Sequence, residues 1–469
     1  MSLKSFYNSV INNLPEVAKP MQKKLSFNEK LKWTLIVLVI FFVLGLIPLY
    51  GLGDNALSSF QFLSIILGAE FGSIISLGIG PIVTASIVLQ LLNGSGILRF
   101  DLTTSEGKKS FQGTQKMLSI FFIVLEAAIY VGMGGLSPQE NISPGILIFQ
   151  LFLGGLLILF MDEVVSKWGF GSGVSLFIAA GVSKGVVVRL LSPLTSPAPG
   201  VEPTLFFGTG KAPVGALPAI FNALPLGAFQ DIMVNILAII ATLAVFGIAV
   251  YAQSMKVEIP LSFGRIRGHG IRWPLSFIYT SNIPVILVAA LIANIQLWAN
   301  LLQKWGHPVL GQYIGNSPAS GLVLWLSPQN LIEKIIHGNL TFSDITHSAV
   351  YVLFMMGGAI IFSIFWVQTA GMDARSQARN MMSSGLQVPG FRRDQRVLES
   401  LLNRYIPPLT VMGAATVGFL AASADLSGAL SSGTGILLTV MIVYHLYEEI
   451  ARQHAMDMYP MLRKFMGGS

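Results

Sequence analysis

Cysteine is absent from this sequence of 469 residues, and charged residues make up only 11% of it. Without cysteine, the chain can form no disulfide, thiolate nucleophile or cysteine-ligated metal centre. A soluble domain carries roughly 25% charged residues, so this chain has too few to cover a surface that faces water. With 53% hydrophobic residues in addition, the composition indicates an integral membrane protein.

Motifs for catalysis or metal binding are also missing. The six histidines form no paired ligand motif such as H-E-x-x-H, so we predict no metal site. The stretch 208–211 resembles the end of a phosphate-binding loop, but Leu205 stands where the first glycine is required, and Ala212 stands where such loops have serine or threonine. We therefore predict no catalytic residue, no nucleotide site and no cofactor, and we expect that the protein is not an enzyme.

Apolar stretches of helical length dominate what remains. A helix needs about 20 mostly apolar residues to cross the hydrocarbon core, and ten stretches reach or approach this length. They cover residues 31–50, 72–92, 117–133, 144–161, 174–188, 232–251, 274–299, 349–370, 407–422 and 435–446. The fifth and tenth are short, so their bounds are the least defined. The sequence predicts an all-α polytopic membrane protein with ten transmembrane helices.

Lysine and arginine are shared unevenly between the two sides that these spans define. If the N-terminus is cytosolic, only five of the 29 basic residues fall in outer loops or at outer span ends, namely Lys184, Arg189, Lys211, Lys304 and Lys334. Because these residue types accumulate in cytosolic loops, we predict a cell-membrane protein with both termini in the cytosol. No cleavage site follows the first apolar run, so we expect that run to be retained as a span.

The two chain ends are expected to lie outside the bilayer core. Val10, Leu14 and Val17 recur at helical spacing beside lysines, a pattern typical of an amphipathic helix on the inner leaflet, with a frayed tail as the alternative. We assign residues 1–30 to this cytosolic segment and residues 451–469 to a cytosolic tail.

Two pairs of motifs recur five spans apart. Residues 78–83 and 281–286 each place a proline among branched aliphatic residues inside a predicted span, and Gly171-Ser-Gly173 is matched by Gly433-Thr-Gly435. Spans five apart run in opposite directions, so the pairs indicate an inverted repeat of the kind that builds transport pathways. Chance coincidence of common residues is the alternative. The predicted organisation is a first half at 31–191, an external hinge loop at 192–231 and a second half at 232–450.

Glu126 is the one carboxylate in the middle of a predicted span. Ionisable residues are costly in lipid and are often kept there for function. One interpretation of Glu126 is therefore a proton or ion relay. The other, which we favour, is a polar contact between helices.

Six stretches spread over the whole chain, among them Val257-Glu-Ile-Pro260, resemble the SecY family, the central subunits of protein-conducting channels, in its archaeal and eukaryotic form. They lie at residues 77–84, 162–173, 257–260, 281–286, 404–410 and 433–439. The resemblance implies an hourglass channel between two five-helix halves, closed at mid-membrane by an aliphatic pore ring. Carried over position by position, the ring consists of Ile79, Val83, Val174, Ile178, Ile286 and Leu438. Such a constriction would resist ions, and ordinary helix packing is the alternative role.

The resemblance also implies a plug and a lateral gate. The plug is a short helix at about residues 56–70 that enters from outside, and its apolar residues are Phe62, Leu63, Ile65 and Ile66. A re-entrant segment without a gating role is the alternative. The lateral gate opens toward lipid between the second and third spans on one side and the seventh and eighth on the other. Thr84, Glu126 and Asn282 are expected to hold it closed by hydrogen bonds of about 1 kcal/mol each.

Arginine-rich loops are the last feature to which the resemblance gives a role. Family members dock the ribosome with the loops that follow the sixth and eighth spans, and arginine suits RNA phosphates because it binds them through two hydrogen bonds. The expected contacts are Arg265, Arg267, Arg392 and Arg393. Determination of membrane topology alone is the alternative role of these residues.

The resemblance thus implies a passive channel for unfolded secretory polypeptides that also releases transmembrane segments sideways into lipid. Its expected partners are the small Sec subunits of the SecE/gamma and beta types, the ribosome, signal sequences with their nascent polypeptides, and membrane lipids. Two other classes stay open from the residues themselves. An ion-coupled secondary transporter would share the inverted repeat but would depend on Glu126, and a membrane scaffold would be insensitive to changes in the ring.

Overall fold

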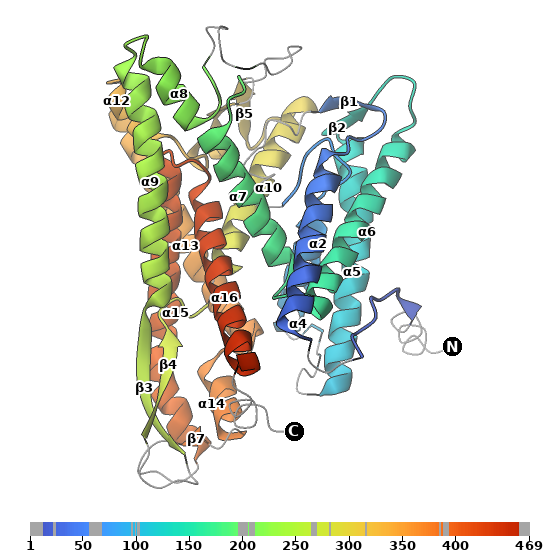
Figure 1. Ribbon diagram of the computed structural model, residues 1–469, viewed down its shortest axis with the longest axis vertical. Helices are drawn as coiled ribbons and strands as arrows, with labels where there is room; N and C mark the ends of the chain where they lie inside the picture. The colour runs from blue at the N-terminus through green and yellow to red at the C-terminus, as the bar shows by residue number, and fades with distance from the viewer. Residues whose placement is uncertain are drawn as a thin grey trace. The chain divides into compact units, whose positions relative to one another are not determined.

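The structure is a computed structural model of the chain. It describes residues 13–21, 25–55, 68–94, 97–98, 100, 104–195, 205, 212–263, 270–280, 283–314, 317–383, 386–387 and 394–458. The described chain is largely helical and divides into two compact units (Figure 1). The first unit comprises residues 1–181 and 442–469, and the second comprises residues 182–441.

The first unit is a set of long helices joined by short loops. Its elements are α2 (Phe27–Leu46), β1 (Leu52–Asn55), α4 (Gly80–Gly94), α5 (Ser105–Gly132), β2 (Leu136–Pro138), α6 (Pro144–Trp168), the first part of α7 (Gly173–Leu191) and the last part of α16 (Gly433–Met458). α5 packs against α4 and α6, and α6 also packs against α2 (Figure 1). The antiparallel pair of β1 and β2 ties the chain that follows α2 to the chain that follows α5.

Polar caps fix where these helices begin. Thr104 accepts a hydrogen bond from the Gly107 amide at 3.1 Å in front of α5, which satisfies an amide that has no partner inside the helix. In α6, Ser143 is the cap and Pro144 the first helical residue, a position where its fixed backbone angle and missing N–H cost nothing. Short polar sequences therefore start helices that are otherwise apolar.

The second unit combines helices with small sheets. Its elements are the rest of α7, α8 (Ala216–Ala223), α9 (Phe229–Ser254), β3 (Lys256–Phe263), β4 (Gly270–Ser276), α10 (Ile283–Lys304), β5 (Gly311–Ile314), β6 (Ser317–Ser320), α11 (Gly321–Trp325), α12 (Leu331–Ile336), α13 (Phe342–Thr369), α14 (Ala374–Ser383), β7 (Leu386–Gln387), α15 (Gln395–Leu426) and the start of α16. α13 packs along α15 and also contacts α10. Tyr351, Met355 and Val417 lie in the main core of this unit.

A β-hairpin extends from the end of α9. β3 and β4 pair antiparallel from Lys256 opposite Ser276 to Ser262 opposite Gly270, and β7 adds to the far end of β3 to give the strand order β4-β3-β7. Ile259 on β3 is fully buried in a second core with residues of α14 and α15. The hairpin is thereby fixed to the base of α15, near α14 in Figure 1.

A helix coincides with each of the ten predicted spans. In the described part of the chain, α5, α6, α7, α9, α13, α15 and α16 are long and apolar enough to cross a membrane, and α4 and α10 contain shorter apolar stretches. The prediction of an all-α polytopic membrane protein is confirmed.

Two predicted spans begin later than expected. The second was expected from residue 72, but α4 begins at Gly80, because the chain before it turns through Gly72 and Gly78 with positive φ angles of 98° and 55°. The seventh was expected from residue 274, where Pro274 instead pairs with Glu258 in the β-hairpin. The prolines of both motifs, expected inside spans, are second residues of α4 and α10, where proline starts a helix without bending it.

The N-terminal segment also departs from its expected helix. Residues 15–20 are not helical. The Val17 amide donates to Glu163 of α6 at 2.9 Å, Lys167 donates to the Val17 carbonyl at 2.7 Å, and the Trp168 indole donates to the Ala18 carbonyl at 2.8 Å. Because these backbone groups are used by α6, they cannot close helical hydrogen bonds. Val10 lies outside the described residues.

Candidate functional site

The proposed ring residues of the first unit lie at the beginnings of α4 and α7. Ile79 precedes α4, is 1% exposed, and its carbonyl accepts from the amide of Val83 at 3.0 Å. Val83 is half-buried on the first turn of α4. On α7, Val174 is half-buried and Ile178, one turn later, is buried.

The second unit repeats this placement. Ile286 is half-buried on the first turn of α10, and Leu438 is 1% exposed on α16. Val83 and Ile286 are both the fourth residues of their helices, and Ile178 and Leu438 are both the sixth. Four of the six residues named from the resemblance therefore occupy equivalent positions on helices that are paired by the predicted repeat.

A non-helical approach precedes α4. The Gly72 amide donates to the Ser76 hydroxyl at 2.9 Å, and Ser76 donates in turn to the Ser73 carbonyl at 2.5 Å. Ser76 is fully buried and Ile75 is 1% exposed. A broken helix of this kind is tolerated at membrane depth only where it is buried in protein or lines a cavity, so the start of α4 has the form expected beside a conducting path.

Two of the three predicted gate residues bond each other within the first unit. The Thr84 hydroxyl on α4 donates to the Glu126 carboxyl on α5 at 3.4 Å, and both residues are partly buried. This bond joins two helices and supports the interpretation of Glu126 as a polar helix contact. Asn282, the third gate residue, lies outside the described residues.

The predicted plug and ribosome contacts fall mostly outside the part of the chain that the structure describes. This applies to Phe62, Leu63, Ile65 and Ile66 and to Arg265, Arg267, Arg392 and Arg393. The last residues of the predicted plug are described. Gly68 adopts φ 53° directly against the carbonyl of Phe177 on α7, and Ala69 is 3% exposed. The end of the plug segment thus packs one residue away from the proposed ring residue Ile178.

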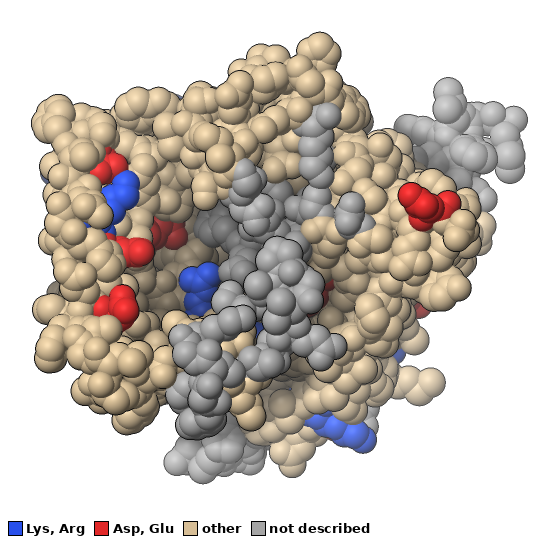
Figure 2. Space-filling model, turned by 90° about the horizontal axis from the view of Figure 1, so that it is seen from above, with Lys and Arg blue, Asp and Glu red and all other residues tan. Residues whose placement is uncertain are grey.

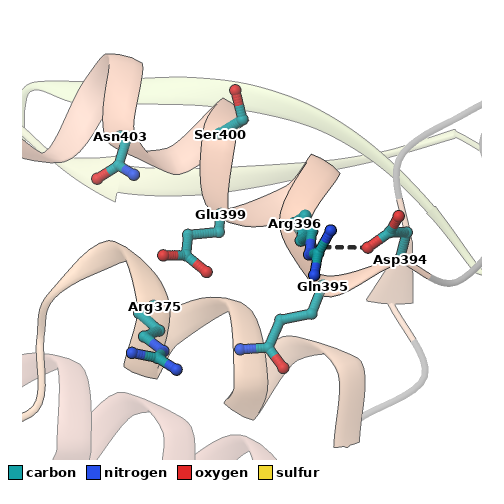
Figure 3. Close-up of a pocket in the computed structure, with 7 residues that line it drawn as sticks. All are labelled: Arg375, Asp394, Gln395, Arg396, Glu399, Ser400 and Asn403. Carbon is teal, nitrogen blue, oxygen red and sulfur yellow. Dashed lines mark hydrogen bonds between the residues drawn. The ribbon is translucent and has the colours of Figure 1, made fainter.

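A charged cavity of about 650 Å³ lies between α14 and the first turns of α15, close to the predicted ribosome-binding loop. Its charged lining consists of Arg375, Asp394, Arg396 and Glu399. Figure 3 shows Arg375 on α14 and Glu399 on α15 directed toward the same space, while Asp394 accepts from the Arg396 amide at 2.9 Å. From the sequence we considered only the basic residues of this region, and the acidic Asp394 and Glu399 lie at the start of α15.

The opposite end of the second unit, where α8 and α12 lie, has few charges on the face that Figure 2 shows. Those present are partly paired, for example Lys334 with Asp344 at 2.6 Å. Among the described residues, no group of three or more histidine or acidic side chains is placed to hold a metal ion.

Two carboxylates that the sequence analysis did not single out contact the first residues of α7 and α16, which are called the pore helices below because they carry proposed ring residues. Asp162 on α6 accepts from the Val174 amide at 2.9 Å, and Asp425 on α15 accepts from the Gly433 amide at 2.6 Å. The sequence contained a signal for both. Asp162 lies ten residues before Ser172 of the Gly-Ser-Gly motif, and Asp425 lies nine residues before Thr434 of the Gly-Thr-Gly motif.

The helix pattern, the broken approach to α4 and the repeated helix starts define a polytopic α-helical membrane protein with an internal repeat. Comparison with known proteins narrows this class. The sequence profile of the SecY family matches residues 73–447. The chain therefore belongs to the SecY family.

Relatives match over their full lengths. The protein translocase subunit SecY of Methanothermobacter thermautotrophicus is 46% identical over 470 residues, which cover 99% of each chain. The subunit of Methanocaldococcus jannaschii is 42% identical and covers 97% of this chain and 98% of its own.

Solved structures agree with the sequence relatives. One described as a protein-conducting channel has a TM-score of 0.80 and 41% identity, covering 98% of this chain and 99% of its own. Sec61 in the canine ribosome-channel complex from the endoplasmic reticulum has a TM-score of 0.77 and 40% identity, covering 98% of this chain and 99% of its own.

Proposed function

We propose that this chain is the pore-forming subunit of a protein-conducting channel, which translocates unfolded secretory polypeptides and releases transmembrane segments sideways into lipid. The observation that carries the proposal is the full-length similarity to SecY translocase subunits. The ring residues lie at helix starts that repeat between the two units, and these helix starts line the path of the polypeptide in the proposed channel. The channel is passive and non-enzymatic, so its partners supply the energy.

The pore ring consists of Ile79, Val83, Val174, Ile178, Ile286 and Leu438. Aliphatic side chains at a constriction expel water and so impede ions. They form no directional bond with a passing chain, which suits a channel that must accept any sequence. Their placement at helix starts supports this role, because proline fixes the backbone at the start of α4 and glycine lets the start of α7 approach its neighbour closely.

The lateral gate consists of Thr84, Glu126 and Asn282. The gate opens between the second and third spans on one side and the seventh and eighth on the other. The Thr84 to Glu126 bond supports the proposal, because it joins α4 to α5, the two helices that form the first side of the gate. The plug at about residues 56–70 closes the pore from outside, and its end against Phe177 is the supporting contact.

The partners are the small Sec subunits, of the SecE/gamma and beta types, and the ribosome, which contacts Arg265, Arg267, Arg392 and Arg393. The similarity to Sec61 in a ribosome-channel complex supports this assignment. The protein lies in the cell membrane with both termini in the cytosol. Its halves are residues 31–191 and 232–450, the loop 192–231 is the hinge between them, and residues 1–30 and 451–469 are cytosolic.

Ion conductance tests the ring. Ile79, Val83 and Ile286 are replaced together by glycine in the complex with its partner subunits, and the resting conductance is measured in planar bilayers. We expect a large increase, because glycine removes the apolar constriction. An unchanged conductance would overturn the ring and favour a scaffold.

Glu126→Gln separates the channel from an ion-coupled transporter. The amide can still accept from Thr84 but cannot carry a proton between two sides of the membrane. We expect preprotein translocation to be retained in proteoliposomes. Complete loss of transport, in a complex that assembles normally, would favour the transporter.

A further inference from the structure

Asp162 and Asp425 have the same structural position in the two units. Each lies near the C-terminal end of one helix, α6 or α15, and its carboxylate contacts the start of the next, α7 or α16. Both are partly buried. Each following helix carries proposed ring residues within its first two turns.

The hydrogen bonds at the two sites correspond closely. Asp162 accepts from the amides of Gly173 and Val174 and from the Ser172 hydroxyl. Asp425 accepts from the Gly433 amide at 2.6 Å and from the Thr434 hydroxyl at 3.5 Å. Each motif supplies one hydroxyl, from Ser172 just before α7 and from Thr434, the second residue of α16, so the two sites share the glycine at the helix start but not the position of the hydroxyl.

Glycine at each helix start permits this close approach. A Cβ on Gly173 would lie 2.5 Å from the Asp162 Cα, and a Cβ on Gly433 would overlap Ala424 and the Ala421 carbonyl. The backbone of each pore helix therefore rests directly on the helix that carries its carboxylate. A negative charge at a helix N-terminus is further stabilised by the unpaired amides of the first turn.

We propose that Asp162 and Asp425 are positioning residues of the channel, which fix the first turns of α7 and α16 and thereby hold Val174, Ile178 and Leu438 at the height of the ring. The inference rests on the proposed pore ring. The carboxylates touch no passing chain and act only through the helices that they hold. The duplication of the site and the glycine contacts are independent of the ring assignment.

The test uses Asp162→Asn and Asp425→Asn in the full complex. Asparagine keeps one acceptor oxygen but replaces the other with an NH₂ group that cannot accept from an amide or hydroxyl. Amide hydrogen exchange is followed by mass spectrometry for the first two turns of α7 and α16, and resting conductance is measured in planar bilayers. Asp344→Asn is the control, because this buried carboxylate bonds Lys334 and Thr341 and contacts neither pore helix.

We expect each variant to accelerate exchange at the start of its own helix and not at the other, and to raise the resting conductance several-fold. The control should change neither. If an aspartate variant does not assemble, Ser172→Ala and Thr434→Val remove only the hydroxyl donor and should shift both readouts less, in the same direction.

Two results overturn the inference alone. One is wild-type exchange at the helix starts of variants that assemble. The other is wild-type conductance in these variants beside a leaking triple-glycine ring variant, which would make the carboxylates ordinary structural caps. Wild-type conductance in the ring variant itself would overturn the ring and the positioning role together.

Discussion

In each unit an aspartate holds the start of the following pore helix, α7 or α16, but the two aspartates differ in their hydrogen-bond donors. Asp162 takes its donors from residues 172–174, which follow it closely in the chain. Asp425 also accepts from the Tyr351 hydroxyl on α13 at 2.9 Å, and Tyr351 is 1% exposed in the main core of the second unit. The second site therefore joins three helices, whereas the first joins two.

This difference shows how an inverted repeat can keep a geometry while changing what stabilises it. The local donors recur because each helix begins with a glycine that lets its first amides approach the carboxylate of the preceding helix. The phenol at the second site is a tertiary contact, so it couples the start of α16 to the packing of α13 against α15. We expect the second site to be the more rigid of the two.

The largest expected effect comes from filling the space at the two helix starts. Gly173→Ala and Gly433→Ala each force a methyl group against backbone, and overpacking of this kind costs up to about 3 kcal/mol. Thermal unfolding of the purified complex should show a markedly lower unfolding temperature for both variants. Gly247→Ala on α9 is the matched control, because its Cβ would meet nothing within 4 Å, and alanine should there be neutral or stabilising. Losses no larger than that of the control would contradict the close approach.

Tyr351→Phe should distinguish the two sites more directly. The change removes a donor to a carboxylate from the second site only, and hydrogen bonds to charged groups contribute about 1.5–3 kcal/mol. We expect a lower unfolding temperature and faster exchange at the start of α16, with no change at α7. Tyr313→Phe, which removes the 3.3 Å bond from the phenol to the neutral backbone carbonyl of Gln296, is the control. Equal effects at both helix starts would show that Tyr351 acts through general packing.

The sequence predicted which segments form the membrane helices, but not where and how each helix begins. Apolar length and the excess of basic residues are local properties, so the ten spans were visible. The start of α10 was misplaced because Pro274 lies in an apolar run, while its strand pairing with Glu258 depends on a segment on the other side of a hairpin. Asp425 was missed because its donors come from α13 and α16, and only folding brings Tyr351 to it. The ring residues came from family resemblance, since an aliphatic residue in a pore and one in a core look alike in a sequence.

The hydrogen bonds between neighbouring helices provide a second comparison of the two units. Thr84 bonds Glu126 at 3.4 Å in the first unit, whereas Ser363 on α13 donates to Thr280, just before α10, at 2.8 Å in the second. Ser363 and Thr280 are at most 1% exposed, so Ser363→Ala should cost about 1 kcal/mol and Thr84→Val less.

Translocation of a preprotein with a weakened signal sequence measures this difference, because a looser gate opens more readily. We expect Ser363→Ala to increase translocation of this preprotein more than Thr84→Val does. Thr416→Val is the control, since that exposed hydroxyl bonds only Met412 of its own helix. The reverse order would indicate that the first unit carries the main barrier to opening.

The smallest expected effect concerns the N-terminal segment, which only the first unit has. Lys167 donates to Glu16 at 2.6 Å, and this hydrogen bond lowers the pKa of the Glu16 carboxyl. Because the pKa is lowered on folding, the stabilisation is present above the ordinary carboxyl pKa and is lost as the pH falls through the lowered value. The Glu16 side chain is largely exposed, so the contribution of the pair should stay below about 1 kcal/mol. Hydrogen exchange of residues 13–21, divided by the intrinsic rate of the unstructured chain at each pH, should show lower protection in acid. Glu16→Gln should show the low protection already at neutral pH, whereas the exposed Glu140→Gln should behave as wild type. Protection that does not change in acid would mean that the backbone bonds to Glu163, Lys167 and Trp168 hold the segment without help from Glu16.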